Sequence, residues 1–254
     1  MKLIKYVFLD IMRNKVLLAY TLFLLAVSFG LFSFSDNPLK AISSLLNIVL
    51  IVLPLFSVIF ATSYYYNAYE FTELVLGQPV KRIHLFLSQF AGVALAMICA
   101  FAIGCGIPVL MYVPDATGIM LIISGVTLTL VFVSLAFLAG VLAKDKARGI
   151  GIALLLWFYF VFLYDAIVLM LLFAFSNYPM ENFMMTMAFL NPVDLIRIIM
   201  LMHLDMAAIM GYTGAVFNTF LGSSTGTLLC FSALSIWILI PLIISTLRFR
   251  KKDI

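Results

Sequence analysis

Charged residues are scarce in this chain of 254 residues: Asp, Glu, Lys and Arg together make up 10% of it, whereas 65% of its residues are hydrophobic. A soluble domain usually contains about a quarter charged and about half apolar residues. So few charges cannot form the solvated surface of a soluble protein of this length, which excludes that class. The mean hydropathy of +1.22 indicates that lipid surrounds most of the chain.

Motifs for nucleotide, metal or nucleophilic chemistry are missing as well. The sequence has no G-x-x-x-x-G-K-[ST] phosphate loop, no HExxH zinc motif and no nucleophile elbow. Asp165 is the only charged residue deep within an apolar stretch, whereas a proton-coupled transporter normally needs several ionisable groups there. The chain is therefore predicted to be neither an enzyme nor a self-powered pump, and to bind no cofactor directly.

Cysteine is rare, and its three copies lie in apolar stretches without CxxC spacing: Cys99, Cys105 and Cys230. This pattern is typical of small buried hydrophobic residues rather than of a disulfide framework. The formal charge of +4 does not indicate a nucleic-acid partner. The basic residues form short clusters beside apolar stretches, where they meet anionic lipid head groups.

What the sequence has in abundance is long apolar stretches. Six of them reach the ~20 residues that a helix needs to cross a bilayer, and they cover residues 16–34, 41–66, 85–113, 117–143, 149–175 and 227–247. We expect an all-α membrane protein with six transmembrane helices in a single domain, residues 1–254. The first stretch is not read as a signal peptide, because it is too long and its removal would leave five spans.

Basic residues are sorted by alternate loops. If both ends of the chain face the cytoplasm, the inner side receives thirteen of the fifteen lysines and arginines, and only Lys40 and Arg197 lie outside. Membrane proteins keep their basic loops inside. We therefore predict a multi-pass protein in the lipid bilayer with cytoplasmic N- and C-termini.

The first 15 residues are expected to form an amphipathic helix in the membrane interface. Its apolar face consists of Ile4, Val7, Phe8 and Ile11. A second amphipathic helix is predicted in the loop 67–84. Its apolar face consists of Phe71, Leu74 and Val75, and its acidic face of Glu70 and Glu73. Gly77 and Pro79 end the helix. This helix either docks into a groove of a cytosolic partner or lies on lipid.

Asp165 is the one charge in the fifth apolar stretch. Burying a carboxylate in a membrane span costs about 2.5–3.5 kcal/mol on insertion scales, so Asp165 should face a protein neighbour or a wet cavity. Two interpretations stay open. Asp165 is either a residue of a translocation path or gate, or it bonds to a neighbouring helix or to a second subunit for structural reasons.

Residues 191–206, in the long connection 176–226, are predicted to form a short helix. Asn191 is a favourable N-cap, Pro192 suits the first helical position, and Asp194 is stabilised at the positive helix end. Arg197, one turn further on, is placed to pair with Asp194. We expect this helix to lie on the outer side of the membrane.

The same connection holds eight of the fourteen methionines: Met180, Met184, Met185, Met187, Met200, Met202, Met206 and Met210. Thioether and imidazole ligands suit Cu(I), whereas methionine is also an ordinary filler of apolar surfaces. No metal site is assigned. The candidate copper ligands are Met200, Met202, His203 and Met206.

Residues 69–82, YEFTELVLGQPVKR, resemble the cytoplasmic coupling helix of ABC-2 type permeases. Such permeases have an interfacial N-terminal helix, six spans and an outer re-entrant hairpin between spans five and six, which here corresponds to residues 176–226. Phe71 stands where the family usually has glycine. The residues implied in coupling to an ATPase are Glu70, Phe71, Glu73, Leu74, Val75, Gly77, Gln78, Pro79 and Arg82.

Two further segments, Leu156–Val161 with Asp165 and Asn191–Arg197, are similar to the NosY group of permeases, which belong to the ABC transporter that matures nitrous oxide reductase. The resemblance implies a bacterial inner-membrane homodimer with a NosF-like cytosolic ATPase that binds ATP and Mg²⁺. It also implies a NosD-like periplasmic copper-handling protein, which would contact Asn191, Pro192, Asp194 and Arg197. An ABC-2 exporter of a drug, lipid or glycan, or a non-transporting assembly or motility subunit, is the alternative.

Overall fold

The computed structural model describes residues 2–35, 37–77, 81–175, 181–204 and 224–251. In these residues every regular element is a helix, which confirms the predicted all-α class. Six helical stretches are long and apolar enough to cross a membrane: Lys15–Phe34, Pro38–Asn67, Arg82–Tyr112, Ala116–Leu142, Lys146–Ala174 and Gly226–Lys251.

Three helices form the centre of the bundle: α3 (Pro38–Asn67), α5 (Arg82–Phe101) and α7 (Ala116–Leu142). Small residues allow these helices to approach closely, as is usual between membrane helices. A methyl group on Gly140 of α7 would lie 2.8 Å from the Tyr65 ring of α3. At the same point the Tyr66 hydroxyl donates to the carbonyl oxygen of Gly140 at 2.9 Å.

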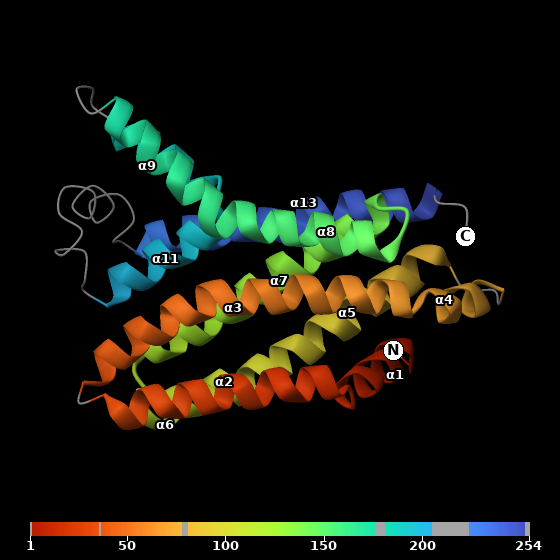
Figure 1. Ribbon diagram of the computed structural model, residues 1–254, viewed down its shortest axis with the longest axis horizontal. Helices are drawn as coiled ribbons and strands as arrows, with labels where there is room; N and C mark the ends of the chain where they lie inside the picture. Colours follow the sequence, from red (N-terminus) through yellow and green to blue (C-terminus); the bar gives the residue numbers. More distant parts are fainter. Residues whose placement is uncertain (1, 36, 78–80, 176–180, 205–223, 252–254) are drawn as a thin grey trace.

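The other spanning helices lie around this centre (Figure 1). They are α2 (Lys15–Phe34), α13 (Ser224–Lys251), and the pair α8 (Lys146–Phe158) and α9 (Tyr164–Ala174), which are joined through a π-helical turn at Tyr159–Leu163. Another π-helical turn, Ala102–Gly106, joins α5 to α6 (Ile107–Tyr112). Large apolar side chains such as Leu155, Phe173 and Leu228 stay exposed on the outer helices, as expected of a surface that meets lipid.

Polar side chains begin several helices where the sequence changes from loop to span. Asn14 caps α2 by accepting a bond from the backbone N–H of Val16, and Asn37 caps α3 in the same way. Asp145 caps α8 through the N–H of Arg148. Each cap satisfies an N–H that has no partner within its own helix.

The N-terminal helix α1 (Lys2–Met12) is separate from α2 and packs against α5. Val7 and Ile11 are buried there, and Gly92 of α5 lies directly against Val7. Part of the apolar face that was expected to enter the membrane interface is therefore covered by the protein itself. The interfacial position of α1 stays a prediction.

The two ends of the bundle differ in what they carry (Figure 1). One end holds α1, the last turn of α13 and the short helix α4 (Tyr69–Leu76); both chain termini lie there. The opposite end holds α11 (Pro192–His203). The helix before it, α10 (Glu181–Phe189), meets α11 at a bend of 111°, measured over Phe183–Phe189 and Pro192–His203, as in a broken span or a re-entrant loop.

Candidate functional site

Helix α4, the predicted coupling helix, is anchored by a polar residue in its middle. The Thr72 side chain is buried, and its hydroxyl donates to the carbonyl oxygen of Ala68 at 2.7 Å. The buried Gln89 amide of α5 donates to the same Thr72 oxygen at 2.8 Å. These two neutral hydrogen bonds connect the end of α3, helix α4 and helix α5.

The predicted apolar face of α4 is divided between two roles. Phe71 is half-buried and stacks on Tyr6 of α1, with ring centroids 5.7 Å apart. Leu74, in contrast, is 75% exposed, and Val75 is half-buried. Only part of the apolar face of α4 therefore packs against the rest of this chain. Its most exposed apolar residue points away from the protein.

The remaining coupling candidates surround this leucine or lie beyond it. Glu70 and Glu73 are exposed on α4, and Gly77 ends the helix by donating its N–H to the carbonyl oxygen of Glu73 at 3.2 Å. Arg82 is the first residue of α5 rather than part of a loop. Gln78 and Pro79 lie outside the described residues.

At the opposite end, Asp165 forms an ion pair with the hairpin. Arg197 of α11 donates through Nη1 to Asp165 Oδ2 of α9 at 2.7 Å and to Asp194 Oδ1 at 2.8 Å. The predicted Arg197–Asp194 pair is therefore present. Of the two interpretations of Asp165, this geometry favours a bond to a neighbouring helix, and it shows that the helix belongs to the same chain.

Asn191 adds hydrogen bonds to this network of Asp165, Arg197 and Asp194. It is fully buried, and its amide donates to Asp194 Oδ2 at 3.0 Å and to the carbonyl oxygen of Phe160 at 2.9 Å. Its own Oδ1 accepts from the N–H of Val193, which confirms the predicted N-cap. Phe160 lies in the π-helical turn between α8 and α9, where the regular hydrogen-bond ladder is interrupted.

The burial of Asn191 and Pro192 bears on the predicted partner surface, which stays a prediction. Both residues were predicted to contact a periplasmic partner, but both are buried within this chain. Asn191 directs its polar atoms inward because the helix start and the Phe160 carbonyl both need a partner. Asp194 and Arg197 remain partly accessible, beside a cavity of about 260 Å³.

This cavity brings carboxylates and thioethers together. Its lining includes Asp165, Asp194, Arg197, Met184 and Met187. The Tyr164 hydroxyl donates to the backbone carbonyl of Met187 at 2.6 Å and so fixes α10 to α9. The cavity is therefore a mostly apolar opening between span five and the hairpin, with the Asp165–Arg197–Asp194 ion pairs in its wall.

The four candidate copper ligands do not share one surface. Met200 is fully buried, Met202 is half-buried, and the Nδ1 atom of His203 lies 3.0 Å from the carbonyl oxygen of Ile199 in its own helix. Met206 lies outside the described residues. Within the described ranges, no group of three or more His, Cys, Asp or Glu side chains is arranged to hold a metal ion.

Comparison with known families covers most of the chain. The model of the ABC-2 family transporter proteins matches residues 51–254, which include α4, the hairpin helices, four of the six candidate spans and the second half of α3. The chain belongs to the ABC-2 transporter family. No curated protein matches the chain.

As an ABC-2 permease, the chain is the membrane component of an ABC transporter, and its family implies an ABC ATPase as partner. It is thus a multi-pass membrane protein and a transport component. The matched region contains both the anchored α4 and the Asp165–Arg197 pair.

Two residues of this arrangement, Thr72 and Gln89, were not predicted from the sequence. Gln89 had a detectable signal, because an amide within an apolar span needs a partner. Thr72 had none, since it lies between two exposed glutamates in its helix and only the packing of α4 shows that it points inward.

Proposed function

We propose that this permease receives the motion of a separate ATPase through α4 and passes it to the central helices. The observation that carries this proposal is the two-sided character of α4: Leu74 is 75% exposed, while Thr72 is bonded to α5. An exposed apolar side chain on a short helix suits insertion into a groove of a partner protein. A helix of that kind transmits force only if its other side is attached.

The attachment of α4 leads directly to the helices that carry the bundle. Ala68 ends α3 and Gln89 lies on α5, so a displacement of α4 acts on both. The Tyr6–Phe71 contact adds α1 to the same unit. ATP and Mg²⁺ are bound by the ATPase in this proposal, and the end that carries α4 and both termini faces the cytoplasm.

In this proposal the outer hairpin passes the motion on to a periplasmic partner. Arg197 fixes α11 to α9, so movement of span five moves the hairpin with it. In this scheme Asp165 is a positioning residue, and the accessible Asp194 and Arg197 are the part of the predicted surface that meets a periplasmic partner. The complex of permease and ATPase either moves a small solute across the membrane or transmits force without transport.

We further propose that the transporter matures the copper site of nitrous oxide reductase, as a NosY-like homodimer with NosF-like and NosD-like partners in a bacterial inner membrane. Support comes from the two segments of the NosY resemblance, which contact each other. Asn191 bonds to Phe160 and Arg197 to Asp165, so both segments contribute to one network. Copper would be a substrate here, with the Met184 and Met187 thioethers beside the network.

The coupling role is tested by Leu74→Asp. A charged group at the centre of an apolar contact costs on the order of 2 kcal/mol, so the affinity for a candidate ABC ATPase that co-purifies with the wild-type chain should fall about 30-fold. Binding is measured with the purified proteins in detergent, together with ATP turnover. Leu39→Asp is the matched control, because Leu39 is 50% exposed in the first turn of α3, at the other end of the span. Equal affinities for the two variants would contradict the coupling role.

The proposed substrate is tested separately. In a strain without this gene, nitrous oxide reductase should be made without its full copper content, and the wild-type gene should restore it. Copper per enzyme is measured by mass spectrometry of the metal. Unchanged copper content would reject the maturation role and favour the export of another substrate, while the binding experiment with Leu74→Asp would still decide the coupling role.

A further inference from the structure

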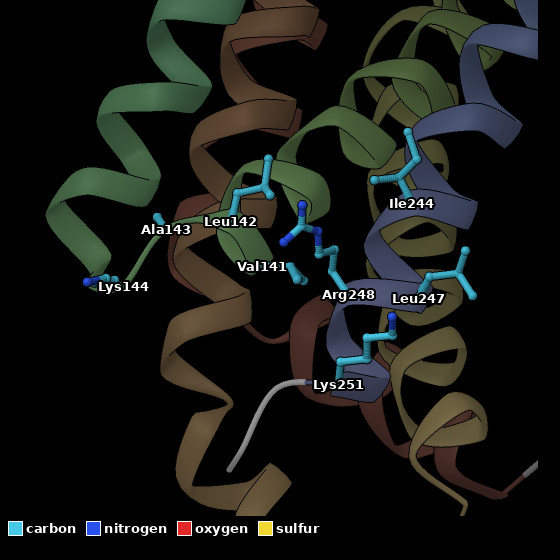
Figure 2. A pocket seen from close by; sticks show the side chains of 8 residues that line it. All are labelled: Val141, Leu142, Ala143, Lys144, Ile244, Leu247, Arg248 and Lys251. Carbon is cyan, nitrogen blue, oxygen red and sulfur yellow. The ribbon is translucent and has the colours of Figure 1, made fainter.

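A second cavity lies at the end of the bundle that carries both termini. It has a volume of about 660 Å³ and lies between the end of α7 and the last turns of α13 (Figure 2). Its lining includes Leu142, Lys144, Ile244, Leu247, Arg248 and Lys251. None of these residues takes part in the α4 anchor or in the Asp165 network.

Two cations reach over this cavity. In Figure 2 the Arg248 side chain extends from α13 toward Leu142, the Lys251 side chain extends along the last turn of α13 toward Leu247, and Lys144 points away. Within the described ranges, no hydrogen bond or ion pair is formed by the side chain of Arg248 or of Lys251. Among the described residues the cavity therefore combines two positive charges that have no carboxylate partner, which favours an anionic ligand.

The wall beneath these charges is apolar and continues along the span. Leu142, Ile244 and Leu247 are 51%, 42% and 55% exposed. Further along α13, the exposed Ile236, Ile240 and Ile243 continue the same side at helical spacing. The apolar row thus runs from the charged end of the helix toward the middle of the membrane, over the length of an acyl chain.

We propose that this cavity binds an anionic phospholipid. Arg248 and Lys251 hold the phosphate, and one acyl chain lies along the α13 row from Leu247 to Ile236. Cations at the end of a span lie at the depth of the lipid head groups. An acidic protein segment would be complementary to the two charges alone. The continuous apolar row on a lipid-facing helix is complementary to the acyl chain of a phospholipid. The lipid would fill the gap between α7 and α13 at the end where the chain meets its ATPase.

The test is native mass spectrometry of the purified full chain in micelles that contain phosphatidylglycerol or phosphatidylcholine. The wild-type chain should retain phosphatidylglycerol about 30-fold more tightly, since each basic residue near an anionic head group contributes about 1 kcal/mol. The double variant Arg248→Gln/Lys251→Gln should lose this preference, and Arg248→Lys should keep it. Inorganic phosphate should not displace the lipid, because it lacks the acyl chain.

The matched control is Lys15→Gln/Lys81→Gln, which removes the same charge at the same end from exposed positions outside the cavity. It should retain the preference for phosphatidylglycerol. Equal binding of both lipids by the wild-type chain, or the same loss in both double variants, would overturn the proposal. Displacement of the lipid by inorganic phosphate would also overturn the proposal. So would an Arg248→Gln/Lys251→Gln variant that still binds phosphatidylglycerol but no longer binds the ATPase.

Discussion

The two ends of this permease attach their short helices by different means. At one end, α11 is joined to span five by an arginine between two carboxylates and by a buried asparagine. At the other end, α4 is joined to α5 through one neutral hydrogen bond and to α1 through one ring contact. Charged groups thus take part in holding α11, whereas uncharged groups hold α4.

The two attachments differ in the free energy that is lost when each contact breaks. An unpaired carboxylate in or near lipid is expensive, so the Asp165–Arg197 contact has a strong tendency to persist. A neutral hydrogen bond contributes only about 1 kcal/mol and can be exchanged for water near the membrane surface. The hairpin should therefore move together with span five, while α4 keeps enough freedom to adapt to a moving partner.

The largest expected effect comes from Arg197→Ala. The substitution leaves Asp165 and Asp194 facing each other without a cation, and we expect a loss of on the order of 2–3 kcal/mol in the free energy of unfolding, between the values for exposed and buried pairs. Chemical unfolding of the purified chain in detergent measures it. The control is Arg148→Ala, which breaks an exposed pair with Asp145 (side chains 70% and 52% exposed) and should cost less than about 1 kcal/mol.

Equal losses in the two arginine variants would show that the hairpin is not held by charge, and the contrast between the ends would disappear. A second substitution separates charge from packing. Adding Asp165→Asn to Arg197→Ala removes one of the two uncompensated carboxylates, so part of the lost stability should return. No recovery would assign the effect to the lost contacts of the arginine side chain.

A smaller effect is expected at the other end, from the double-mutant cycle of Gln89→Leu and Thr72→Val. The coupling free energy between the two residues should be about 1 kcal/mol, the usual contribution of a neutral hydrogen bond. Unfolding in detergent measures it. Ser88→Ala is the control on the same helix, because Ser88 is half-buried and, among the described residues, its hydroxyl donates to the carbonyl oxygen of His84 in its own helix. A coupling energy as large as the loss in Arg197→Ala would refute the contrast.

The sequence was informative where one residue type decides the outcome locally. Asn191 acts as the N-cap and Pro192 as the first helical residue of α11, because both preferences depend on backbone geometry within a few residues. The Arg197–Asp194 pair was predicted for the same reason, since the two residues are one helical turn apart.

Long-range contacts were less predictable. Asp165 clearly needed a partner, but the choice of Arg197 depends on how α11 folds back against α9. The burial of Asn191 and Pro192 was missed because the same N-cap chemistry serves an exposed and a buried helix start. The split of the α4 face between Phe71 and Leu74 was missed because it depends on the position of Tyr6 in α1.

Apolar length and the rarity of charge were sufficient to determine that this is a helical membrane protein with six candidate spans, because a bilayer accepts few other structures. Periodicity and end-capping residues then located the short helices. Only the tertiary structure decided which polar groups meet across helices, which face of α4 stays exposed, and where Arg248 and Lys251 reach over a cavity. These features depend on the packing of segments distant in the chain, which no local pattern encodes.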